Sequence, residues 1–231
     1  MIDVVLLIIV AVVTYCVAGE GAWGAAITAM SVVLAGLIAM NFYEPICENL
    51  MGGDEYWQRR MDLVVLVGLF VGALTGLRAG ADHLSPTYIG VHRMVHEGVR
   101  WFSGLMAGYV TMAFLLTALH TAALPREFMG FRAERANFFA TAPDRQWLGF
   151  VQYVTERVCV SSPARPFDGP QIKLGDATDP NRNKTNNWPP EDIWPSFPIR
   201  YATRRERGSA PPAPQPVRPA QPQQPSAAPG F

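Results

Sequence analysis

The chain has 231 residues, a formal net charge of zero and 49% hydrophobic residues. Without excess positive charge it does not offer the clustered basic surface that nucleic-acid binding requires, which excludes a nucleic-acid partner. The cysteines Cys16, Cys47 and Cys159 are scattered and odd in number, so they indicate neither a disulfide framework nor a metal site.

The two parts of the chain differ in composition. Five of the 19 Lys and Arg residues precede Leu124, and 16 of the 20 prolines lie at or after Pro163. The first part is therefore apolar and poor in positive charge, whereas the second part is polar and interrupted by proline.

The first apolar region, residues 4–43, contains one charged residue, Glu20, with glycines on both sides of it. This pattern predicts a tight turn there, between helices over residues 4–18 and 22–43. The first helix has 15 residues, about 22 Å, which is short of a bilayer core of about 30 Å. No positive region precedes it, so we expect a retained helix rather than a cleaved signal peptide. We expect Pro45 to end the second helix.

Two more apolar segments follow a polar connection over residues 44–60. Asp62 is the predicted N-cap of the third helix, because its carboxylate can accept hydrogen bonds from the first free amides. An amphipathic stretch over residues 91–100 leads into the fourth helix. The two helices are predicted over residues 63–84, before Pro86, and over residues 101–124, before Pro125.

Runs of this length with almost no charge are typical of membrane spans. The sequence therefore predicts an all-α membrane protein in contact with the lipid bilayer, with a four-helix transmembrane bundle over residues 1–125 and a polar, partly disordered C-terminal tail. Residues 126–160 are predicted to form a helical segment that is either interfacial or docked on the bundle. Residues 161–208 are an irregular, aromatic-containing extension, and residues 209–231 are a disordered Pro/Ala/Gln-rich tail.

Glycine recurs every four residues in the third helix. In lipid, close backbone approach at small residues is a main source of helix association. We predict that this ridge packs against another helix of the chain, with a shorter ridge on the fourth helix as its match. Self-association into a homo-oligomer through the same face is the alternative. The ridges are Gly68, Gly72, Gly76 and Gly80 on the third helix, and Gly104 and Gly108 on the fourth.

Five polar residues near the membrane are candidates for function. Arg78 and Asp82 lie four residues apart, opposite the nearby glycines, so they are predicted to pair. They either anchor the helix end at the headgroups or line a polar pathway. Glu20 is predicted at a surface turn and His120 at a helix end near the opposite headgroups, with a proton or ion route as the alternative for both. Arg93, just before the fourth apolar segment, completes the set.

His92 and His96 have a spacing that permits joint metal coordination, but no convincing third ligand accompanies them, so we predict no metal site. The sequence has no Gly-rich phosphate loop, no nucleophile elbow and no recognisable pair of catalytic carboxylates. We therefore expect neither an enzyme nor a cofactor.

The positive charges also predict an orientation. With four spans, the N-terminus, the connection at residues 44–60 and the C-terminal flank share one side of the membrane. That side has five positive residues near the membrane and the other side has three, so the positive-inside rule places both termini in the cytoplasm. The five are Arg59, Arg60, Arg126, Arg132 and Arg135, and the three are Arg78, Arg93 and Arg100.

Four features of residues 1–124 occur together. Asp3 leads straight into an apolar helix, and a glycine-centred turn around Glu20 joins the first two helices. The third helix precedes a short connector, and a run that contains Arg93 then enters a glycine-spaced last helix. In this arrangement the chain resembles the CvpA (colicin V production protein) family of bacterial inner-membrane proteins.

The last run of that family is similar to D-R-x-x-G-x-x-x-G-x-x-x-G. In this chain His92 and Arg93 stand for the Asp-Arg pair, and His96, Arg100 and Gly104 stand for the three glycines. Arg93 and Gly104 keep the family's residue type, and the other three do not. The basic residue that usually precedes the first turn glycine is also missing.

The resemblance implies a non-enzymatic protein of the cell inner membrane, with a structural or accessory role in toxin production or secretion, or in envelope homeostasis. The residues themselves leave an alternative, a small channel or transporter subunit with a polar route near Glu20, Arg78, Asp82 and His120. A third hypothesis is a membrane anchor that presents the tail, residues 209–231, to a protein partner.

Overall fold

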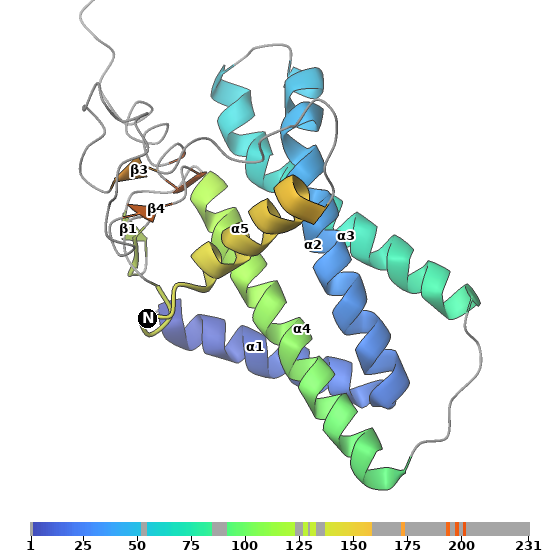
Figure 1. Cartoon of the computed structure of the whole chain (residues 1–231). Coiled ribbons are helices and arrows are strands. Elements are labelled where there is room, and N and C mark those ends of the chain that lie inside the picture. The colour runs from blue at the N-terminus through green and yellow to red at the C-terminus, as the bar shows by residue number, and fades with distance from the viewer. Residues whose placement is uncertain are drawn as a thin grey trace, which may run out of the picture.

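The structure is a computed structural model of the chain, shown in Figure 1. It describes residues 2–51, 55–84, 92–122, 127–128, 130–132, 137–158, 172–173, 193–194, 197–198 and 201. The predicted disordered tail, residues 209–231, lies outside the described residues.

Four long helices make up most of the described chain: α1 (Ile2–Gly19), α2 (Gly21–Met51), α3 (Glu55–Leu84) and α4 (Arg93–Thr121). Each contains a segment long and apolar enough to cross a membrane. Many apolar side chains on their outer faces are exposed, which is consistent with contact to lipid. The 18 residues of α1 correspond to about 27 Å, so this helix is longer than the sequence pattern predicts.

α4 lies at the centre of the bundle, and α1 crosses it (Figure 1). A Cβ added to Gly104 would lie 2.8 Å from the carbonyl oxygen of Thr14, and one added to Gly108 would lie 2.8 Å from that of Val10. The two backbones therefore approach to a distance that glycine permits and larger residues do not. The short ridge on α4 packs against α1, and not against the ridge on α3 as predicted.

α3 runs beside α2 and is the least buried of the four helices. Of the residues in its apolar 18-residue segment, 11% are buried, against 56% in the corresponding segment of α4. Leu66 and Phe70 face the core, and the Phe70 ring stacks on Phe114 of α4 with centroids 4.2 Å apart. Gly68, the first glycine of the ridge, follows Leu66 by two residues, which is a rotation of about 200° around the helix axis. The ridge therefore lies on the face of α3 that points away from the core. The four glycines are exposed, and a Cβ added to Gly68, Gly72, Gly76 or Gly80 meets no atom within 4 Å. The predicted packing of this ridge within the chain is therefore wrong, because the ridge faces outward.

Three predicted helix boundaries are also wrong. α4 begins at Arg93 rather than at residue 101, so most of the amphipathic stretch before the fourth apolar segment is part of this helix. α2 continues past Pro45, although a proline inside a helix removes a backbone hydrogen bond and costs about 3 kcal/mol. Tyr43 and Cys47 are buried on either side of it, and their packing offsets this cost. α3 begins at Glu55, so Asp62 is not an N-cap and lies inside the helix as a buried residue.

After α4 the chain forms a helix, α5 (Pro143–Tyr153), that continues into a π-helical turn, η1 (Val154–Val158). The indole of Trp147 in α5 packs directly against Gly36 of α2, because a Cβ added to Gly36 would lie 2.5 Å from the indole. The indole also meets Phe114 of α4 edge-on, with centroids 6.5 Å apart. Of the two predicted alternatives for this segment, the structure has the docked helix.

Within the described part of the chain, four two-residue strands form two small antiparallel ladders, which the all-α prediction does not include. Beyond them Phe197 and Tyr201 are buried in the core, and the Tyr201 hydroxyl lies 2.9 Å from the Tyr43 hydroxyl on α2. The aromatic extension therefore contributes to the core. The ladders pair β1 (Glu127–Phe128) with β2 (Phe131–Arg132), and β3 (Ile172–Lys173) with β4 (Ile193–Trp194).

Replacing Gly108 by alanine is expected to destabilise the protein, because the new methyl group would lie 2.8 Å from the Val10 carbonyl oxygen. Overpacking of this kind costs about 1–3 kcal/mol, and thermal unfolding in detergent measures it. Gly72→Ala is the matched control: its methyl group meets no atom within 4 Å, so the Tm is expected to stay at or above the wild-type value. Equal Tm values for the two variants would contradict the close α1–α4 contact.

Candidate functional site

The turn between α1 and α2 carries Glu20, as the glycine pattern predicts. The Glu20 amide donates to the Val17 carbonyl at 3.1 Å, and Gly21 has a positive φ of 85°, which glycine adopts at low cost. The Glu20 side chain lies over Gly24, where an added Cβ would be 2.9 Å from the Glu20 Cβ. The Thr28 hydroxyl donates to the carboxylate at 2.7 Å. The loop between α1 and α2 thus holds the Glu20 carboxylate against the N-terminal part of α2.

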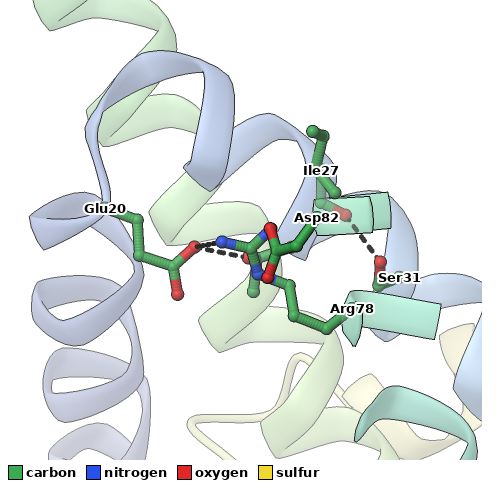
Figure 2. A network of polar contacts seen from close by, with 6 residues as sticks. Glu20, Ile27, Ser31, Arg78 and Asp82 are labelled. Atoms are coloured by element: carbon green, nitrogen blue, oxygen red, sulfur yellow. Dashed lines mark hydrogen bonds and ion pairs between the residues drawn. The ribbon is translucent and has the colours of Figure 1, made fainter. Parts of the chain in front are cut away.

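Arg78 of α3 connects this carboxylate to Asp82, and Figure 2 shows the three side chains together. Arg78 Nη2 lies 3.0 Å from Glu20 Oε2, and Arg78 Nη1 lies 2.5 Å from Asp82 Oδ1. The predicted pairing of Arg78 with Asp82 is confirmed. The structure adds Glu20, which is 58 residues from Arg78 in the sequence. We call Glu20, Arg78 and Asp82 the charge cluster.

The charge cluster is partly exposed. The side chains of Glu20, Arg78 and Asp82 are 36%, 27% and 59% exposed, respectively. Ion pairs at this exposure contribute about 0–1 kcal/mol each, because water and salt screen them. The cluster therefore connects the end of α3 to the α1–α2 turn without contributing much to stability, and an arginine near a helix end is well placed to reach lipid headgroups.

α4 begins at this same end of the molecule. The Ala22 amide donates to His96 Nε2 at 3.4 Å, so this ring nitrogen acts as an acceptor. Arg93 is exposed in the first turn of α4, and the Arg100 guanidinium lies 5.4 Å from the centre of the Trp101 ring. Arginine and tryptophan together are typical of a membrane–water interface.

His120 lies at the other end of α4, as predicted for a helix-end residue, and its side chain is fully buried within the protein. Its Nε2 lies 2.9 Å from Asp144 Oδ2 at the start of α5, and both side chains are 0% exposed. The Phe131 ring packs edge-on against the imidazole, with centroids 5.0 Å apart. This pair holds α5 on α4, because removing either partner would leave a buried polar group without the other.

Sequence reasoning missed Asp144. A proline followed by an acidic residue is a signal for a helix start, and Asp144 does lie in the first turn of α5. That signal does not reveal a partner 24 residues away in the sequence. The neighbouring Arg145 is also affected by the packing: burial lowers the pKa of its guanidinium, and the Asp144 carboxylate opposes this shift.

The predicted polar residues therefore divide between two ends of the molecule. Glu20, Arg78 and Asp82 gather at the end where α4 begins, close to His96. His120 is 24 residues further along α4 than His96, about 36 Å at 1.5 Å per residue. The buried residues of α4 between these two positions are mostly small or apolar.

Comparison of the chain with protein-family models, with curated proteins and with solved structures finds no match. The resemblance to the CvpA family therefore rests on the sequence features alone. One of them, Asp3, has a defined role in the structure: its carboxylate accepts a hydrogen bond from the Phe138 amide at 3.0 Å. This contact places the start of α1 at the end of the molecule where α5 docks.

Asp144→Ala is expected to loosen α5, because His120 would lose its buried partner. Breaking a buried pair in this way costs about 3–5 kcal/mol. Limited proteolysis in detergent, with cleavage mapped over residues 143–158, measures the loosening. The double variant His120→Leu/Asp144→Leu removes both polar groups and is expected to be cleaved more slowly than Asp144→Ala. Cleavage of Asp144→Ala at the wild-type rate would argue against this role of the pair.

Proposed function

We propose that the chain is an integral protein of the bacterial inner membrane, of the colicin V production type, with a structural or accessory role in toxin production or secretion, or in envelope homeostasis. The colicin V production type rests on the sequence features of residues 1–124. The observation that supports a structural role is the separation of the polar groups into two ends, with mostly small or apolar buried residues of α4 between them. Such an arrangement suits helices that hold a fixed shape in lipid.

The alternative is a small channel or transporter subunit. It requires polar side chains or a water-filled cavity to follow one another across the bilayer. Arg78 is already paired with two carboxylates, and the His120 side chain is fully buried in contact with Asp144. Arg78 lies near the level where α4 begins and His120 lies near its end, so among the described residues these side chains do not follow one another across the bundle. The geometry therefore favours the structural role.

The proposal includes an orientation with both termini in the cytoplasm. The start of α1 lies at the end where α5 docks, as the contact between Asp3 and Phe138 shows. Thr155 of η1 donates to Asn41 at 3.2 Å, so the second half of α2 lies beside η1. The positive-inside count assigns this end to the cytoplasm.

Single cysteines in a variant without native cysteines test this orientation. A membrane-impermeant maleimide is expected to label positions 50 and 140 from the cytoplasmic side, and positions 20 and 90 from the outer side of the inner membrane. The variants are Glu20→Cys, Leu50→Cys, Gly90→Cys and Ala140→Cys. Labelling of position 20 from the cytoplasm would mean that α1 enters the membrane without crossing it, and the four-span arrangement would be wrong.

The accessory role is tested by export of colicin V from producing cells that lack the chain. Export is expected to fall without the chain and to return when the wild-type chain is supplied. Arg78→Ala is expected to restore export as well, because the charge cluster contributes about 0–1 kcal/mol per ion pair and lines no route in this proposal.

Liposomes that contain the purified protein provide the opposing test. Their ion leak is expected to equal that of liposomes without protein. A leak that the wild-type protein causes and Arg78→Ala abolishes would refute the structural role and favour the transport alternative.

A further inference from the structure

The imidazole of His96 lies directly against the start of α2. The Ala22 amide donates to His96 Nε2 at 3.4 Å, although the two residues are 74 positions apart in the sequence. A Cβ added to the preceding residue, Gly21, would lie 3.7 Å from the same ring nitrogen. This contact therefore joins the first turns of α4 to the first turn of α2.

The contact requires the neutral imidazole. An amide can donate only to a ring nitrogen that carries no proton, so the ring proton of neutral His96 lies on Nδ1. A protonated imidazole has donors on both nitrogens and cannot accept from Ala22. The amides at the start of α2 also carry partial positive charge, which opposes a cation at this place. Protonation of His96 therefore removes the hydrogen bond and adds a repulsion.

His96 is accessible to protons from water. Its side chain is 40% exposed, and histidine is the residue whose charge ordinarily changes between about pH 5 and pH 8. The Glu97 carboxylate lies 3.8 Å from His96 Nδ1, and Arg100 lies 3.6 Å from the same carboxylate. Glu97 is the next residue on α4, so it stays beside the imidazole whether or not the contact with α2 is made. It therefore attracts a protonated His96 in both states and does not hold α4 against α2.

Other charges around the contact leave this direction unchanged. On the α2 side, Glu20 belongs to the charge cluster, and its carboxylate already accepts from Thr28 and Arg78. α2 itself has no charged residue before Glu44. The effect of protonation on the contact is therefore set by the start of α2. The other titratable or charged groups at this end of the described helices are exposed to water and salt, which screen them: Tyr15 and Cys16 on α1, Asp82 and His83 on α3, and His92 and Arg93 on α4.

We propose that His96 is a pH-sensitive switch at the end of the bundle where α4 begins. Neutral His96 holds the first turns of α4 against α2, and protonated His96 releases them. The contact is therefore made at neutral and basic pH and lost as the pH falls, with a change of up to about tenfold per pH unit in the ratio of released to docked protein for one proton. In the proposed orientation the switch responds to the pH outside the inner membrane, but it depends neither on that orientation nor on the role in secretion.

A pair of nitroxide labels measures this release in nanodiscs. Gly19→Cys and Gly98→Cys place one label beside the α1–α2 turn and the other on α4, in a variant without the native cysteines. A Cβ added at either glycine meets no atom within 4 Å, so the attachment points cause no steric conflict. Electron paramagnetic resonance is expected to give one narrow distance distribution at pH 8 and a second, longer population at pH 5.5. The same distribution at both pH values would overturn the proposal.

Three substitutions in the labelled protein separate the charge of His96 from other effects of pH. His96→Gln cannot take up a proton and is expected to show the same distribution at both pH values. His96→Lys is positively charged at both and is expected to show the longer population at both. His92→Gln is the matched control, because it removes an exposed imidazole that makes no side-chain cap to α4, and it is expected to keep the response to pH. A docked His96→Lys, or a response that persists in His96→Gln, would overturn the proposal.

Discussion

The direct backbone contact between α1 and α4 is the constraint on which the rest of the bundle depends. Gly104 and Gly108 let the α4 backbone approach the carbonyl oxygens of Thr14 and Val10, so this face of α4 is fixed against α1. The other faces of α4 then have defined directions. Phe114 meets α3 and α5, and His120 meets Asp144. One close crossing therefore sets the orientation of the aromatic and polar contacts that follow it.

Lipid as the surrounding solvent explains why α3 is so exposed. In water, a helix with apolar side chains and four glycines on its outer face would be a liability for aggregation. In a bilayer, the same face contacts a medium as apolar as itself, and burial brings no hydrophobic gain. Glycine spacing therefore has two meanings in this chain. On α4 it allows helix contact, and on α3 it leaves room at the surface.

The helices themselves are predictable from the sequence because long runs without charge are a strong local signal. Their ends are less predictable, as Pro45 and Asp62 show, since burial of Tyr43 and Cys47 outweighs the local preference of proline. The pairing of Arg78 with Asp82 follows from helical geometry and could be predicted. The contacts of Arg78 with Glu20 and of His120 with Asp144 could not, because they depend on which helices lie side by side. The same limit applies to the partner of a glycine ridge, which spacing alone does not identify.

The position of Trp147 over Gly36 has a consequence for biogenesis. α5 leaves the ribosome after all four apolar helices, and its indole fits a recess that exists once α2 and α4 stand next to each other. Trp147 can therefore dock in this way only after α2 and α4 have come together. A chain with a misplaced second helix would lack this recess, and α5 would lose the site against which its tryptophan packs.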